Sequence, residues 1–383
     1  MSDVDTAAPS KTAAPAPGSS WIQRHVLPPA GTPARGSTLL RNLIVTVVVV
    51  AVLLLATGRT SDFWDYQIAV IAAYLCAVAG LTVLTGLNGQ ISLGHSALMA
   101  TGAYTVAFVI TAFTNHNVFA QWTLPVALLA GTVVTALLGL IIGVAAARLR
   151  GPYLAGITLA VAVAVPAVTS GYSHLFKGDQ GIDIAINPPP AALGESFSNE
   201  EWQAWYSIIA AALVMLLLAN LVHGGFGRKM RAVRDNEVSA QLAGIHVART
   251  QVITFVLSAA CAGLGGGVYA AIADGANPGA YSLTLSLYLL LAIVLGGLGS
   301  LIGAVWGAIA IVVLPYATTQ LMSDESLKLQ GNVPTAIFGV LLIVIAIAVP
   351  GGLQGLLRKA GRALRRRSTA STEPSSPTPN TTS

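Results

Sequence analysis

Polar side chains interrupt the apolar sequence between Gly86 and Tyr104, which reads GLNGQISLGHSALMATGAY. Non-helical backbone at membrane depth persists only where it is buried in protein or lines water. The functional interpretation is therefore a broken-helix entrance beside a translocation path. The alternative is a cytoplasmic turn whose glycines allow tight geometry, and the residues leave both open. The polar groups that could contact a solute belong to Asn88, Gln90, Ser92 and His95.

The sequence lacks the combinations of residues that catalysis or metal binding would need. His95 has no second His, Cys or acidic residue at ligand spacing, so we interpret it as a structural hydrogen-bonding residue. Ser300 follows Gly-Leu-Gly, but a serine nucleophile needs a base within reach, and no His lies centrally in an apolar segment. No GxxxxGK[ST] motif occurs, so we expect ATP hydrolysis on another polypeptide. The sequence predicts no catalytic residue, no metal ligand and no cofactor bound by this chain.

A basic loop at residues 223–250, HGGFGRKMRAVRDNEVSAQLAGIHVART, separates two apolar segments. Asp235 or Asn236 can cap a helix, Glu237 then falls in the first turn, and Gly244 suits the position after the last turn. These signals predict a short helix over Glu237–Ala243, preceded by a basic segment. The basic residues of the loop are Arg228, Lys229, Arg231, Arg234 and Arg249.

Two interpretations of the basic loop follow from these features. A cytoplasmic loop collects positive charge without any partner, because Lys and Arg accumulate on that side of membrane spans. The capped helix and a length far beyond a simple turn favour the other interpretation, a docking element that connects the membrane body to a separate motor.

The composition identifies the class of protein. The chain has 383 residues, of which 54% are hydrophobic and only 9% are charged. A soluble domain carries about 25% charged residues, so this chain is expected to be an all-α polytopic membrane protein in contact with lipid. The net charge of +5 is explained by orientation in the membrane and does not require a nucleic-acid partner.

Ten apolar segments are expected to form membrane spans. Most have the 17–25 residues that a spanning helix needs. The eighth and ninth are joined by Gly296-Gly297-Leu298-Gly299-Ser300, and they form either one long helix or two short ones. The segments are 42–58, 66–86, 96–113, 122–147, 152–172, 204–222, 251–273, 283–298, 301–321 and 333–349.

The distribution of Lys and Arg favours two separate helices. With ten spans and a cytoplasmic N-terminus, all of the 20 basic residues except Arg59, Lys177 and Lys328 fall on the cytoplasmic side. We therefore expect both termini and the basic loop to be cytoplasmic, in a multi-pass protein of the cytoplasmic membrane. The predicted organisation is a disordered tail at 1–38, a membrane domain at 39–357 with an external loop at 173–203, and a basic then disordered tail at 358–383.

None of the ten apolar segments contains Asp, Glu, Lys or Arg. Charged groups within the membrane mark ion paths and proton relays, so their absence argues against transport driven by a buried carboxylate. Energy is then expected from a separate subunit. A stand-alone secondary carrier or facilitative channel remains the alternative. Small-xxx-small spacings, such as Gly139/Gly143 and Gly263/Gly267, are expected to pack helices within the chain.

Five motifs resemble the branched-chain amino acid permease subunits of ABC importers, the LivM-like family, over about residues 66–350. The stretch 86–104 is similar to the family's Gly-x-x-Gly-Gln-x-Ser-Leu-Gly-His motif, and GRKMRAVRDNEVSAQLAGI at 227–245 is the most specific match. The other three are RGPYLAGITLA at 150–160, KGDQGI at 177–182 and GGLGSLIGAVWGA at 296–308.

The resemblance implies the ten-helix importer permease fold and a set of partners. These are a second, homologous permease subunit, two cytoplasmic ATPase subunits that bind ATP, and an external substrate-binding protein. Branched-chain amino acids, urea, short amides or other small polar solutes fit the family. The implied ATPase-coupling residues are Arg231, Arg234, Asp235, Asn236, Glu237 and Gly244. Candidates for the translocation path or the broken helix are Asn88, Gln90, Ser92, His95, Tyr104 and Thr158.

Overall fold

The computed structural model describes residues 35–115, 122–148, 152–184, 188–190, 197–322, 339 and 352–355. The predicted C-terminal tail lies outside this part of the chain, as do residues 1–34 of the N-terminal tail and all of segment 333–349 except residue 339. The chain divides into two compact units, Met1–Arg41 and Asn42–Ser383. The second unit contains the helical body, and the fold is described for that unit.

Helices make up nearly all of the described structure. Seven of them are long and apolar enough to cross a membrane, and the shorter apolar helices α12 and α13 follow. The long helices are α2 (Arg35–Thr57), α3 (Asp62–Leu81) continued by the π-helix η1 (Thr82–Leu87), α4 (His95–Asn115), α5 (Thr123–Ala146), α6 (Pro152–Gly171), α8 (Asn199–His223) and α11 (Val247–Ile272). The remaining elements are α7 (Ser173–Phe176), η2 (Gly178–Gln180), β1 (Ile182–Asp183), α9 (Gly225–Asp235), α10 (Glu237–Leu242), β2 (Gly275–Ala276), η4 (Pro278–Tyr281), α12 (Leu283–Gly296) and α13 (Leu301–Met322).

The helices agree with nine of the ten predicted apolar segments, and the tenth lies outside the described residues. In particular, α12 and α13 are two helices, as the charge distribution predicts. They separate at Gly297 and Gly299, whose φ angles of 112° and 79° lie in the region that favours glycine. The chain between them therefore turns sharply and cannot continue as one helix.

Helix α11 lies at the centre of the packing and contacts α3, α4 and α5. Its glycines allow this approach, because a Cβ on Gly266 would lie 2.0 Å from the carbonyl oxygen of Met99, and one on Gly263 would lie 2.4 Å from Thr135. The predicted small-residue face at Gly263 therefore packs within the chain, against α5. The same holds for Gly139, whose added Cβ would lie 2.3 Å from Ala259 of α11.

One feature departs from the all-helical expectation. Strands β1 and β2 pair antiparallel, with Ile182 opposite Ala276 and Asp183 opposite Gly275. They fasten the predicted external loop to the chain that follows α11. Two-residue strands leave no alternation of apolar and polar residues in the sequence, which is why the pairing was not predicted.

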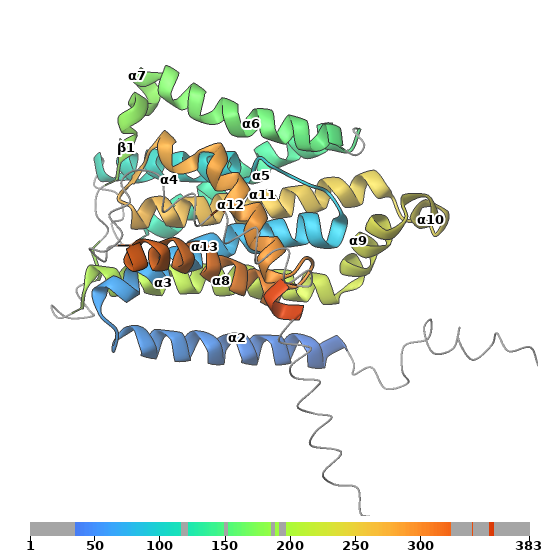
Figure 1. The fold of residues 1–383 in the computed structure, drawn as a ribbon, viewed down its shortest axis with the longest axis horizontal. Coiled ribbons are helices and arrows are strands. Elements are labelled where there is room, and N and C mark those ends of the chain that lie inside the picture. Colours follow the sequence, from blue (N-terminus) through green and yellow to red (C-terminus); the bar gives the residue numbers. More distant parts are fainter. Residues whose placement is uncertain are drawn as a thin grey trace, which may run out of the picture. The chain divides into compact units, whose positions relative to one another are not determined.

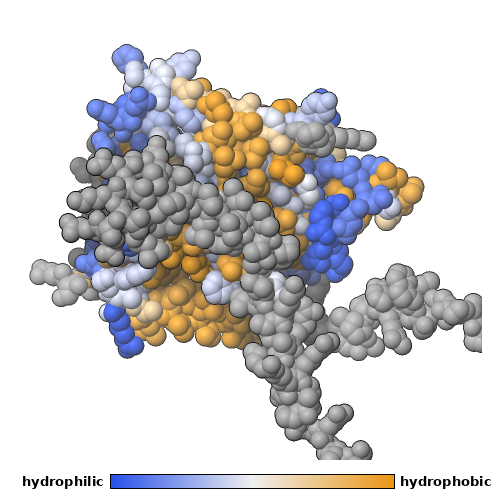
Figure 2. Space-filling view, in the orientation of Figure 1, coloured by the Kyte–Doolittle hydropathy of each residue, from blue (hydrophilic) through white to orange (hydrophobic). Residues whose placement is uncertain are grey.

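The two ends of the helical body differ in character (Figure 1). The basic loop, which folds as α9 and α10, lies at one end, which we call the α10 end. The short elements α7 and β1 lie at the opposite end, which we call the β1 end. On the face seen in Figure 2, apolar side chains occupy the middle of the body and hydrophilic ones gather at both ends. This is the pattern that a membrane-spanning body requires.

Candidate functional site

The basic segment that precedes the predicted short helix is itself a helix, α9. Its buried residues include Met230 and Val233, three positions apart, which places them on one face. Arg231 donates a hydrogen bond from Nη2 to the carbonyl oxygen of Val222, at 2.8 Å, and so satisfies a carbonyl near the end of α8. The spacing of Met230 and Val233 was a signal in the sequence for this helix, which was predicted only as a basic segment.

The predicted short helix is confirmed as α10, Glu237–Leu242, with Ala243 at its end. The side chain of Asn236 caps it, because Oδ1 accepts a hydrogen bond from the backbone N–H of Ser239 at 2.9 Å. Gly244 has a φ of 78°, as a residue after the last helical turn commonly does. The basic loop is therefore a pair of helices with a defined corner at Asn236.

The outer surface of α10 is apolar. Val238 is 66% exposed and Leu242 is 86% exposed, and their four-residue separation places them on the same side of the helix. Figure 2 shows apolar side chains at this tip beside the hydrophilic surface of α9. The Glu237 carboxylate accepts a hydrogen bond from Gln251 Nε2 at 3.0 Å, which ties the start of α10 to α11.

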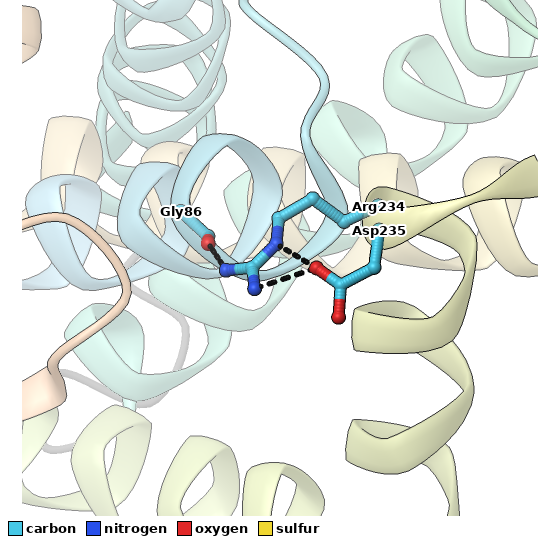
Figure 3. A network of polar contacts seen from close by, with 3 residues as sticks. All are labelled: Gly86, Arg234 and Asp235. Carbon is cyan, nitrogen blue, oxygen red and sulfur yellow. Dashed lines mark hydrogen bonds and ion pairs between the residues drawn. The ribbon is translucent and has the colours of Figure 1, made fainter.

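Arg234, at the end of α9, connects the basic loop to the polar stretch that begins at Gly86 (Figure 3). Its Nη1 donates a hydrogen bond to the Gly86 carbonyl oxygen at 2.8 Å. The same guanidinium donates to Asp235 Oδ1 from Nε at 3.0 Å and from Nη2 at 2.8 Å. Arg234 thus contacts Gly86 and Asp235 at once, and each contact fixes the orientation of the planar group.

Gly86 is a meeting point of three predicted motifs. A Cβ on Gly86 would lie 2.3 Å from the backbone N of Gly299, in the turn between α12 and α13. A Cβ on Gly89 would lie 2.9 Å from Cγ of Arg234. The polar stretch, the basic loop and the α12–α13 turn therefore pack together at the α10 end, through backbone contacts that only glycine permits.

Residues 88–94 connect η1 to α4, and we call them the extended segment. Asn88 still has helical backbone angles, and residues 89–94 are non-helical. Burial alternates along it: Asn88, Gln90 and Ser92 are buried, whereas Gly89 and Ile91 are exposed. The three polar side chains are thus buried within the helical body, although the backbone is not a regular strand, because Asn88 has helical angles and Gly89 has a φ of 78°.

Helix α4 begins deep within the helical body. Nε2 of His95, its first residue, lies 2.8 Å from Oγ of Ser258, which is about 16 Å along α11 from its first residue at 1.5 Å per residue. Nδ1 of His95 lies 3.1 Å from Oγ of Ser92. The prediction of a structural hydrogen bond for His95 is confirmed, and the depth of the helix start favours the broken helix over a turn at the surface.

Two further contacts hold the extended segment. The backbone N–H of Leu93 donates to Thr158 Oγ1 of α6 at 3.0 Å. Ser96 donates from its backbone N–H to Ser286 Oγ of α12 at 2.9 Å. The extended segment and the start of α4 are thereby anchored to α6, α11 and α12.

The predicted path residues consequently fall into three groups. Ser92, His95 and Thr158 are engaged in the anchoring hydrogen bonds described above. Tyr104 lies apart from them, about two and a half turns after His95 along α4, where its ring packs edge-on against Phe176 with centroids 5.2 Å apart. The last two, Asn88 and Gln90, are buried side chains of the extended segment.

The sequence profile of one protein family, described as "Branched-chain amino acid transport system / permease component", matches residues 64–350. That range contains the extended segment, the basic loop and the α12–α13 turn. The chain belongs to this family. It is a membrane permease component, a class whose role is transport and not catalysis.

Relatives that are transport permeases agree with this membership. The chain is 29% identical over 310 residues to the high-affinity branched-chain amino acid transport system permease protein LivM of Salmonella typhimurium, covering 74% of this chain and 68% of the relative. It is 26% identical to LivH of the same organism, covering 74% of this chain and 92% of the relative. The fructose import permease protein FruG of Bifidobacterium longum is 26% identical over 82% of this chain and 93% of its own. No solved structure matches the chain.

Proposed function

We propose that this chain forms the membrane passage of an ABC importer for branched-chain amino acids or a related small polar solute. The observation that carries the proposal is the junction at Gly86, where the basic loop contacts the broken helix through the Arg234 hydrogen bond. Such a contact can transmit movement from a docked motor to the passage. The solutes named for LivM and FruG, a branched-chain amino acid and fructose, both carry no net charge near neutral pH.

The α10 end is assigned to the cytoplasm in this proposal. Four basic residues of α9 lie there, and Arg148 follows the end of α5 at the same end. The acidic residues Asp62, Glu200 and Asp183 lie at the β1 end. Cytoplasmic loops near span ends collect Lys and Arg, so the charge asymmetry supports a cytoplasmic α10 end and, by the same argument, cytoplasmic termini.

The basic loop is the proposed docking site for the ATPase subunits. The Val238–Leu242 pair offers an apolar surface on a short capped helix, and α9 places positive charge beside it. ATP is bound and hydrolysed on the ATPase subunits, since this chain has no phosphate-binding loop motif. A second permease subunit and an external binding protein complete the assembly, in line with the separate LivM and LivH permeases to which the chain is similar.

Within this assembly the extended segment lies beside the passage. Hydrogen bonds anchor it and the start of α4 to α6, α11 and α12, and irregular backbone persists at membrane depth where it is buried in protein or lines water. Transporters commonly place their solute sites at such interruptions of helices.

The deciding experiment is uptake of isotopically labelled leucine by proteoliposomes that contain the complete assembly. Uptake is expected to require ATP and to stop when the phosphate-binding lysine of the ATPase subunits is replaced by alanine. Liposomes with this chain alone should take up no leucine. Gradient-driven uptake by the chain alone, or uptake that survives the lysine replacement, contradicts the proposal and favours a stand-alone carrier.

A further inference from the structure

Asn88 and Gln90 carry buried polar atoms that are left without partners. Asn88 is 3% exposed and Gln90 is 7% exposed. Neither Nδ2 nor Oδ1 of Asn88 has a hydrogen-bond partner in the described part of the chain, and neither does Oε1 of Gln90. Most buried side-chain polar atoms in proteins are paired, and an unpaired one weakens folding. Three such atoms on adjacent side chains therefore require an explanation.

Loose packing does not explain these unpaired atoms, because neighbouring polar groups have hydrogen-bond partners. Ser92 contacts His95, His95 contacts Ser258, and Thr158 accepts from the backbone of Leu93. The extended segment is thus held firmly at one end. The amides of Asn88 and Gln90 lie toward its other end and are buried, as Ser92 is.

The amides of Asn88 and Gln90 are close in sequence to residues that contact the basic loop, which a docked ATPase would move. Gly86 and Gly89, which both contact Arg234, are within four residues of each amide in the sequence. A shift of α9 and α10 acts on Asn88 and Gln90 through this contact. Free amides at that position can bind a solute in one arrangement of the basic loop and release it in another.

We propose that Asn88 and Gln90 form a hydrogen-bonding site for the transported solute, and that this site accepts solutes without net charge. The inference rests on the proposed function and adds the residues and the ligand chemistry. An amide pair offers both donors and acceptors and no formal charge. The charged side chains at the neighbouring Gly86 contact, Arg234 and Asp235, form an ion pair with each other, so a charged solute at Asn88 would meet a counter-charge that is already paired.

A zwitterionic amino acid meets these conditions. Its carboxylate accepts from Asn88 Nδ2, and its ammonium donates to Asn88 Oδ1 or Gln90 Oε1. A neutral polyhydroxylated solute can make the same kinds of hydrogen bond. An ordered water molecule could also fill the site, and the experiment separates water from solute.

The test replaces each amide by an apolar side chain of similar size, Asn88→Leu and Gln90→Leu, in the complete assembly. Removing unpaired buried polar atoms should raise the melting temperature of the detergent-solubilised complex. The same variants should raise the KM for leucine uptake in proteoliposomes by about tenfold, the effect of losing one good hydrogen bond. A merely structural role predicts a lower melting temperature instead.

Two control variants complete the test. Ser92→Ala removes a paired hydroxyl, so it should lower the melting temperature. Gln90→Glu keeps the shape and the acceptors but adds a charge, and it should abolish leucine uptake at neutral pH while the assembly still forms.

Each outcome is decisive. Wild-type KM in both leucine variants overturns the solute site and assigns the amides to water, and a fall in melting temperature assigns them to folding. Wild-type uptake by Gln90→Glu overturns the preference for solutes without net charge. If the wild-type assembly shows no ATP-dependent uptake, the proposed function itself is wrong. This result is distinct from the outcomes for the Asn88 and Gln90 variants, which test only the solute site.

Discussion

The Arg234 side chain reaches across 148 positions of sequence to donate a hydrogen bond to the carbonyl oxygen of Gly86 at 2.8 Å. Gly86 belongs to the π-helical turn that ends α3, and the extended segment starts two residues later. This contact joins the basic loop to the broken helix with a charge-assisted hydrogen bond, which is about twice as strong as a neutral one. Under the proposed function, it would connect a docked ATPase to the passage.

Arg234→Ala is therefore expected to uncouple ATP hydrolysis from transport. Uptake of leucine should fall by roughly tenfold or more, because a charge-assisted hydrogen bond contributes about 1.5–3 kcal/mol. Co-purification of the ATPase subunits should persist, since the guanidinium points to Gly86 and not to the surface of α10. Arg234→Lys should recover only part of the uptake, because Lys lacks the planar fork that contacts Gly86 and Asp235 together. Full uptake in Arg234→Ala would contradict this role.

A substitution at Gly86 should damage folding. An alanine Cβ there would lie 2.3 Å from the backbone N of Gly299, and overpacking against backbone costs about 1–3 kcal/mol or more. The matched control is Gly156→Ala in α6, where an added Cβ meets nothing within 4 Å. We expect a lower melting temperature for Gly86→Ala and an unchanged or higher one for Gly156→Ala. Equal melting temperatures would show that the Gly86 contact with Gly299 is not needed.

Local features of the fold could be predicted from the sequence. The long helices could be predicted from continuous apolar runs, because an apolar segment in a membrane must satisfy its own backbone hydrogen bonds, and a helix does so. The α10 helix follows from Asn236 and Gly244, whose effects act within a few residues. The break between α12 and α13 was also accessible, through charge distribution and the glycines at the turn.

Contacts between distant segments could not be predicted in this way. Nothing in the residues around Gly86 indicates that Arg234 or Gly299 packs against them, because a glycine records a close approach without recording the partner. For the same reason, the sequence could not show which of the candidate path residues are already hydrogen-bonded. Ser92 and Asn88 are both polar, and only the contact of Ser92 with His95 in the structure shows which of them is already paired.

Cysteine accessibility tests the orientation. Leu242→Cys is exposed at the α10 end and Asp183→Cys is exposed at the β1 end. The native Cys76 is buried and Cys261 is half-buried, so both should react slowly. In intact cells, a membrane-impermeant maleimide should label Asp183→Cys and leave Leu242→Cys unlabelled until the cells are opened. The reverse pattern would invert the assignment of the two ends.

Asn236→Ala should loosen α10 without disturbing the helical body. The substitution removes the side-chain cap at Ser239, which typically contributes about 1 kcal/mol. A helix of six residues has little stability of its own, so faster hydrogen exchange is expected across 237–242. Asn236→Ser retains an acceptor and should preserve most of the protection. Unchanged exchange in the alanine variant would mean that contacts with α11, such as the hydrogen bond between Glu237 and Gln251, are enough to hold α10 without the Asn236 cap.

Acidic substitutions on the tip of α10 should prevent binding of the ATPase subunits. Val238 and Leu242 are the most exposed apolar side chains of the basic loop, and an exposed apolar pair on a projecting helix is typical of a docking surface. Val238→Asp combined with Leu242→Asp should abolish co-purification of the ATPases, because the acidic side chains would be desolvated in an apolar groove. Gln241→Asp is the matched control, since it adds charge at a neighbouring exposed position without removing an apolar contact. Retained co-purification in the double variant, with the control also unaffected, would place the docking surface on α9 and leave α10 as a link to α11.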